Sequence, residues 1–175
     1  METIVRRVRP HEWRQVRELR LAALHDPEAA IAFLDSIDQA ELRDDAFWQK
    51  RTADAATGGE SAQFVAIRDR DWVGTATGLA RSVGSTDHLD RPVATARVDV
   101  VGVFVHPQHR GAGVIDRLLD AIAEWACQHG SRALTLDVHV DNVRAQAAYR
   151  RCGFADSGAR FTSSIGPELE MVRPL

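Results

Sequence analysis

The stretch VDVVGVFVHPQHRGAGVIDRLLDAIAEW, residues 98–125, decides the fold class. It begins as an apolar run of strand type and ends in a helical pattern, with apolar residues three and four positions apart from Gly113 to Gln128. Gly130 ends that helix, and a second apolar run, Ala133–Val140, follows it. This order predicts a strand, a helix and a strand joined as a right-handed parallel crossover.

Elements on both sides of this unit extend the same alternation. A helix is expected from Pro10, a second over 44–56, and a third over 142–152 that stops at Gly153. The segment 26–39 has no clean period and predicts a loop or a short helix. The strands are expected at 2–9, at 63–68 and 72–80 with a tight turn at 69–71, at 94–105, and in two short segments after Gly153.

The resulting order is β-α-α-β-β-β-α-β-α-β-β, with a mixed central sheet of about seven strands and helices on both faces. We expect one α/β domain over residues 1–175, because the chain has 175 residues, of which 45% are hydrophobic.

Composition excludes several classes of protein. The net charge of −3 comes from 22 basic and 25 acidic residues spread along the chain, which argues against a nucleic-acid partner. No apolar run reaches the roughly 20 residues that span a bilayer, so no membrane partner is expected. The two cysteines lack metal or redox spacing, and METIVRRVRP lacks the apolar core of a secretory leader. These features predict a cytoplasmic protein.

The passage from strand to helix at His106–Ile115 has the chemistry of an anion site. A helix start carries unpaired N–H groups and partial positive charge. Gly111 and Gly113 would let a phosphate approach the backbone, and His109 and Arg110 add positive charge. A P-loop would need a lysine after its second glycine, and a dinucleotide fingerprint would need a third glycine. The residues alone therefore indicate a ligand of phosphate type.

Three motifs here resemble those of the GNAT superfamily of N-acetyltransferases. QHRGAG (108–113) is similar to the signature Q/R-x-x-G-x-G/A that holds the pyrophosphate of acetyl-CoA, and NVRAQAAYRRCGF (142–154) is similar to the family's second motif. VFVHP (103–107) resembles the end of the strand that pairs with the pantetheine arm. The resemblance implies acetyl-CoA as co-substrate, no metal, and a cofactor site made of Val103, Phe104, Val105, Gln108, His109, Arg110, Gly111, Ala112, Gly113, Val114, Ile115, Asp116, Asn142 and Tyr149.

One residue of the loop departs from the family pattern. Many members have a third small residue where this chain has Ile115. Its branched side chain would either crowd the pyrophosphate or turn toward the packed side of the helix. In the second case binding survives, because backbone amides hold the phosphate.

Asn142 and Tyr149 each have a structural and a chemical interpretation. Asn142 is a good helix N-cap whatever else it does. Tyr149 shares a helical stripe with Asn142, Ala145 and Cys152, which suits a core residue. The resemblance implies that its hydroxyl faces the sulfur of CoA and donates a hydrogen bond to the leaving thiolate.

A base is needed because an ammonium with a pKa near 10.4 is deprotonated only about once in a thousand at pH 7. The resemblance suggests Asp99, on the strand where the histone-acetylating branch has a glutamate. The alternative is an ion pair between Asp99 and Arg97, which share a strand face. Asp137 and His139 on the next strand are further candidates. His106 and His109 lack a third ligand nearby, which argues against metal.

The predicted reaction is transfer of acetyl from acetyl-CoA to a primary amine by direct attack. Neither cysteine forms a recognisable pair with a histidine, so no covalent intermediate is expected. The resemblance implies an oxyanion held by a backbone N–H near Val105. The alternative function is a non-catalytic acyl-CoA-binding or regulatory module.

The acceptor is expected to be a small-molecule or peptide amine. The resemblance implies that residues 20–50 and 82–91 line the site that binds the amine. Their acidic residues suit a cationic amine or form an ordinary solvated face. Polyamine, aminoglycoside, amino acid and protein N-terminus all remain open, as does a homodimer.

Overall fold

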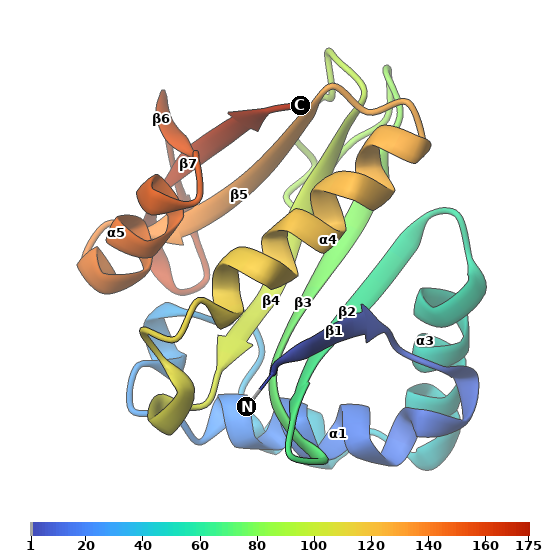
Figure 1. Cartoon of the computed structure of the whole chain (residues 1–175). Helices are drawn as coiled ribbons and strands as arrows, with labels where there is room; N and C mark the ends of the chain where they lie inside the picture. Colours follow the sequence, from blue (N-terminus) through green and yellow to red (C-terminus); the bar gives the residue numbers. More distant parts are fainter. Residues whose placement is uncertain (1) are drawn as a thin grey trace.

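A computed structural model describes residues 2–175 and contains one seven-stranded sheet in the order β1-β2-β3-β4-β5-β7-β6 (Figure 1). Only β4 and β5 run parallel, and every other neighbouring pair is antiparallel. The strands are β1 (Ile4–Arg7), β2 (Ser61–Arg68), β3 (Asp71–Arg81), β4 (Arg97–Val105), β5 (Ala133–His139), β6 (Ala155–Ser163) and β7 (Gly166–Pro174). The predicted mixed sheet of about seven strands is confirmed.

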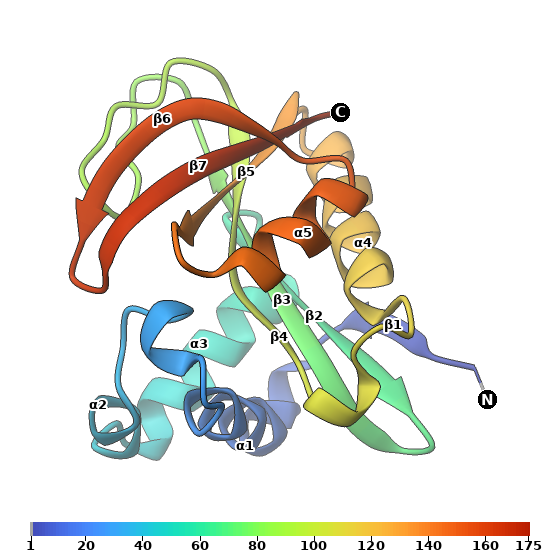
Figure 2. The same ribbon diagram turned by 90° about the vertical axis from the view of Figure 1, so that its left-hand side faces the viewer.

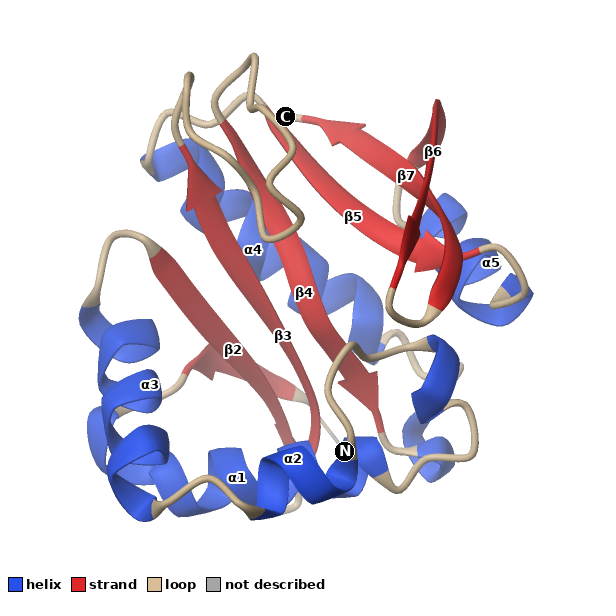
Figure 3. Ribbon diagram, turned by 180° about the vertical axis from the view of Figure 1, so that it is seen from behind, coloured by secondary structure: helices blue, strands red, loops and turns tan. Residues whose placement is uncertain are grey.

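Helices cover both faces of the sheet. They are α1 (Trp13–Leu24), α2 (Ile37–Glu41), α3 (Asp45–Thr57), α4 (Val114–Gln128) and α5 (Val143–Arg151), with 3-10 turns at Pro10–Glu12, Ala29–Ile31 and Pro107–His109. The apolar face of α4 packs in one core with Tyr149 of α5, whereas α1 and α3 pack in a second core. Figure 3 shows α1–α3 on the face of the sheet away from α4. Successive side chains of β4 point to opposite faces of the sheet, so this strand contributes to both cores: Val105 belongs to the first and Phe104 to the second.

Local sequence explains the ends of several elements. Asp44 caps α3 by accepting a bond from the amide of Phe47 at 2.8 Å, and Ser36 and Gln39 form a capping box on α2. The predicted hairpin turn contains Asp69 and Arg70 with φ of +53° and +76°, which matches the twist of a two-residue hairpin.

Some predicted boundaries were wrong. The strand expected from residue 94 begins at Arg97, because the polar loop runs three residues further. The helix expected from Pro10 opens as a 3-10 turn and becomes α-helical at Trp13. The two final strands, expected to be short, have nine residues each, since they pair with each other and β7 also pairs with β5.

The feature that positions the site is the separation of β4 from β5. These strands pair only at Val98 with Leu134 and at Asp99 with Thr135. A bulge then bends β4, because Val101 pairs with Thr77 and Phe104 with Thr75, with one extra residue between them on β4. Gly102 occupies this bulge with φ of +61°, a left-handed conformation that favours glycine. The two strands therefore diverge toward their carboxyl ends (Figure 3).

Candidate active site

A cavity of about 880 Å³ fills the opening between the diverging strands. The carboxyl half of β4, the end of β5, the loop before α4 and one face of α5 line it, and α1, α3 and the chain around Phe33 also contribute. Figure 2 shows α5 and the start of α4 beside the same opening. Most of the residues predicted to bind the cofactor line it: Val103, Phe104, Val105, His109, Arg110, Gly111, Gly113, Val114, Ile115, Asp116, Asn142 and Tyr149. Gln108 and Ala112 are exposed and do not.

The loop before α4 has a backbone that requires its two glycines. Gly111 and Gly113 have φ of +75° and +72°, and a Cβ added at either would meet no atom within 4 Å. Gly113 is the N-cap of α4 and offers no side-chain oxygen to the helix amides. The start of α4 therefore lines the cavity with backbone N–H groups that no N-cap side chain pairs, which suits an anion.

Arg110 differs from the expectation that it adds free positive charge at this helix end. Its Nη2 lies 2.5 Å from a carboxylate oxygen of Asp26, and its Nε donates to the carbonyl of Val105 at 3.0 Å. The ion pair neutralises the guanidinium, and the hydrogen bond to Val105 ties the loop to the end of β4. His109 lines the cavity without such a partner among residues 2–175.

Ile115 lines the cavity and also packs against the core that contains α4. This contact agrees with the interpretation in which the side chain turns toward the packed side of the helix. The effect of Ile115 on pyrophosphate binding stays a prediction.

The start of α5 is fixed by two amide side chains. Asn142 is buried and accepts a bond from the amide of Ala145 at 3.2 Å, which confirms its role as N-cap. Gln146 donates to the carbonyls of His139 and Val140 at 3.2 and 2.9 Å. Gln146 was not found from the sequence, because its partners lie in the turn after β5. Together these bonds hold α5 against the carboxyl end of β5.

Tyr149 is 9% exposed and belongs to both the core and the cavity wall. Its ring packs against Phe154 at 6.0 Å between centroids, whereas no hydrogen bond joins its hydroxyl to another residue among 2–175. Burial, followed by the charge of Cys152, raises the pKa of Tyr149 far above the usual value of a phenol. The hydroxyl therefore stays protonated near neutral pH and remains a hydrogen-bond donor.

Asp99 lies at the last position where β4 pairs with β5 and is 4% exposed. It accepts bonds from Nε of Arg97 at 2.8 Å, from Nε of Arg81 at 3.0 Å and from the hydroxyl of Thr135 at 2.6 Å. The ion pair between Asp99 and Arg97, considered as an alternative from the sequence, is present. Asp99 also pairs with Arg81, which the sequence did not indicate. These donors occupy both oxygens of the carboxylate, and the role of Asp99 as base stays a prediction.

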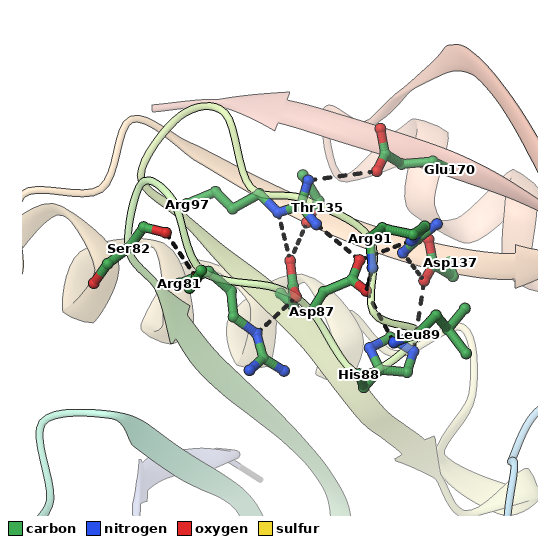
Figure 4. Close-up of polar contacts among 12 residues, drawn as sticks. Arg81, Ser82, Asp87, His88, Leu89, Arg91, Arg97, Thr135, Asp137 and Glu170 are labelled. Atoms are coloured by element: carbon green, nitrogen blue, oxygen red, sulfur yellow. Dashed lines mark hydrogen bonds and ion pairs between the residues drawn. The ribbon is translucent and has the colours of Figure 1, made fainter.

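Asp137 lies on β5, on the same face of the sheet as Asp99 of β4. Figure 4 shows Asp137 among the charged groups that link the loop 82–96 to β4 and β5. Arg91 donates to Asp137 at 2.7 Å and His88 lies 3.7 Å away. Burial raises the pKa of Asp137 to about 6, although the hydrogen bond from Arg91 opposes the shift. His139 and Glu168 are buried beside it on the cavity wall. A carboxylate with such a pKa is suited to accept a proton near neutral pH.

Three further features concern metal ligands, the two cysteines and the length of the helices. The part of the chain that the structure describes holds no cluster of three residues fit to bind a metal ion. Burial raises the pKa of the Cys152 thiol to about 12, which makes it a poor nucleophile, and Cys127 is a free exposed cysteine. No helix among residues 2–175 has both the length and the apolar character needed to cross a bilayer.

Residues 13–154 match the model of the acetyltransferase (GNAT) family. The chain belongs to this family. The resemblance carried by QHRGAG and by the second motif is thereby confirmed.

Known GNAT proteins agree in fold and in part of the sequence. The chain is 43% identical to an aminoglycoside N(6')-acetyltransferase type 1 of Stenotrophomonas maltophilia over 32% of its own length and 37% of that protein's. It is 28% identical to a protein of the same name from Salmonella typhimurium, over 55% of its own length and 63% of that protein's. The chain thus spans between about a third and two thirds of these relatives. A GNAT acetyltransferase of Streptococcus pneumoniae shares the fold, with a TM-score of 0.76, 16% identity and coverage of 99% and 100%.

Proposed function

We propose that this GNAT protein transfers the acetyl group of acetyl-CoA to a primary amine by direct attack. The observation that carries the proposal is that the glycine loop, Tyr149 and Asp137 line one cavity. An anion site, a donor for a leaving group and a base are the parts that acyl transfer between a thioester and an amine requires.

The steps follow from these three groups. The amides at the start of α4 hold the pyrophosphate, and the thioester lies between β4 and β5. Asp137 takes a proton from the amine, directly or through water, while the nitrogen forms a bond to the acetyl carbon. The carbon–sulfur bond then breaks, and Tyr149 donates a hydrogen bond to the thiolate that leaves. A backbone N–H near Val105, at the end of the bent strand, serves the oxyanion.

Asp137 is preferred to Asp99 as the base because their surroundings differ. Asp99 accepts bonds from two guanidinium groups and a hydroxyl, whereas a single arginine hydrogen-bonds Asp137. A base with a pKa of about 6 is ionised at neutral pH and still holds a proton better than an ordinary carboxylate.

The variant Asp137→Asn should lower kcat/KM by about 10²- to 10⁴-fold. In the wild type kcat/KM should rise with pH through about 6, because only the ionised carboxylate accepts a proton. The variant should lose this limb and keep only the rise toward the pKa of the amine. Steady-state rates from pH 5 to 9 measure both, and an unchanged limb near pH 6 would remove Asp137 from the mechanism.

Asp99→Asn is the companion variant. It replaces the carboxylate that Arg97 and Arg81 share with a neutral amide. Arg81 loses its ion pair, whereas Arg97 keeps the one with Asp87 at 3.1 Å, so the free energy of unfolding should fall by about 3 kcal/mol, as expected when a buried ion pair loses one member. The limb near pH 6 should survive. Urea denaturation measures the first effect. Loss of the limb in this variant and its retention in Asp137→Asn would return the role of base to Asp99.

The proposal is tested by release of CoA thiol from acetyl-CoA with a panel of amines, with an amine-free control. Amine-dependent release is expected, with saturation by the amine. The aminoglycoside relatives support an amine acceptor, but they match only part of this chain. Binding of acetyl-CoA with no release for any amine would favour the non-catalytic module.

A further inference from the structure

Three arginines gather beside the part of the cavity formed by α1 and α3, and two of them share one carboxylate. Asp35 accepts bonds from Arg20 and, at 3.0 Å, from Arg43. Arg51 lines the cavity with Arg20 and Asp35, and among residues 2–175 it forms neither a hydrogen bond nor an ion pair. Three guanidinium charges face one carboxylate charge, so this arginine cluster carries an excess of two positive charges.

Arg51 is exposed in the wall of the cavity, and its guanidinium has no counter-ion among the described residues. Desolvation, followed by the charges of Arg20 and Arg43, lowers the pKa of Arg51 below its usual value. Arg20 has a second deficit, because its Nε is buried without a hydrogen-bond partner. A bound oxyanion would supply the missing charge and acceptor, and a planar guanidinium suits a carboxylate or a phosphonate.

The arginine cluster is separate from the helix end that suits the pyrophosphate of CoA. Arg20 and Arg51 belong to α1 and α3, which pack on the face of the sheet away from α4 (Figure 3). Of the other arginines that line the cavity, Arg110 is paired with Asp26 and Arg144 with Glu28, whereas Arg151 is exposed on α5.

Another part of the same cavity carries the opposite charge. Asp137 and Glu168 line it from β5 and β7, and the side chain of Glu168 has no hydrogen-bonding or ion-pairing partner among the described residues. Phe33 and Leu34 add apolar surface near the arginine cluster. The cavity therefore has a cationic part, an anionic part and an apolar wall.

We propose that the acceptor is a zwitterion, an amine that also bears a carboxylate or a similar oxyanion, and that Arg51 and Arg20 bind this anionic group. The proposal rests on the proposed function and deepens it. It favours an amino acid or related amine over the polycationic acceptors of the named relatives.

Matched amines test the proposal. Phenylalanine, its carboxamide and an aminoalkyl phosphonate are compared as acceptors. The wild type should favour the oxyanion-bearing amines by at least about 100-fold in kcat/KM over the carboxamide, because removing the anion leaves the guanidinium unpaired. Comparison of the carboxylate with the phosphonate identifies the preferred oxyanion. Equal rates with acid and amide would overturn the proposal and leave amine transfer intact.

Arg51→Gln should lower this preference to below about 10-fold, mainly through KM for the acceptor, with KM for acetyl-CoA unchanged. Arg43→Gln is the matched control, since Arg43 also contacts Asp35 but does not line the cavity, and it should keep the preference. The melting temperature of Arg51→Gln should not fall, because the change removes repulsion from Arg20 and Arg43. A lower melting temperature, or a higher KM for acetyl-CoA in place of the acceptor effect, would contradict the proposal.

Binding without turnover gives a second measurement. In the presence of CoA, 3-phenylpropionate should raise the melting temperature of the wild type and not that of Arg51→Gln. This shift can be measured even if no amine is acetylated. The experiment therefore distinguishes a failure of the proposed function from a failure of the anion site. No shift in the wild type would overturn the anion site.

Discussion

Tyr149→Phe should lower kcat about 100-fold while the free energy of unfolding changes little. The ring that packs against Phe154 remains, and the hydroxyl has no hydrogen bond to another described residue, so its loss leaves no polar group of the fold unpaired. The loss should appear in kcat with KM for acetyl-CoA nearly constant, since the hydroxyl acts on the thiolate only as the carbon–sulfur bond breaks.

The chain contains a single tyrosine, which gives this prediction an independent check. Tyrosinate absorbance on titration to high pH reports Tyr149 alone, and it should not appear until well above the usual value near 10, because burial raises the pKa of Tyr149. An ordinary titration with unchanged turnover in Tyr149→Phe would show a tyrosine that is only structural. A large fall in stability would have the same meaning.

Gly111→Leu should abolish the stabilisation that acetyl-CoA gives the wild type. A ligand at 100 times its Kd stabilises the folded state by about 2.7 kcal/mol, which a thermal melt detects. Leucine at this position would fill the open space beside the amides of the loop, where an added Cβ meets no atom within 4 Å. The melting temperature without ligand should also fall, because φ of +75° costs a side chain about 1–2 kcal/mol.

Gly130→Leu separates these two effects. Gly130 follows α4 at its other end with φ of +74°, an added Cβ there also meets open space, and it does not line the cavity. The variant should lose a similar amount of stability and keep the full shift with acetyl-CoA. Normal binding of acetyl-CoA by Gly111→Leu would place the pyrophosphate elsewhere.

The sequence was sufficient for the order of the elements and for most of the residues that line the cavity near α4 and α5. These depend on local patterns: the period of residues 113–128, the glycines of the loop before α4, and the N-cap at Asn142. Each pattern is set by residues close together in the chain, so a single sequence displays it.

The opposite side of the cavity, which we propose binds the acceptor, could not be predicted in this way, because its charges are paired over long distances in the chain. Asp26 binds Arg110, and Asp99 binds Arg81 as well as Arg97. The acidic residues of 20–50 that line the cavity, Asp26, Glu28 and Asp35, are therefore each paired with an arginine, and unpaired positive charge remains at Arg51. Composition cannot distinguish paired from unpaired charges.

Transfer of isotope-labelled acetyl from acetyl-CoA, followed by mass spectrometry in a single turnover, tests the central claim most directly. The account predicts that the label appears on the nitrogen of the amine as CoA forms, and that no labelled protein accumulates at any time. Labelled protein, with the acetyl group on Cys127, Cys152 or any other side chain, would contradict direct attack. Bound acetyl-CoA that never passes its label to an amine would contradict the transferase activity itself.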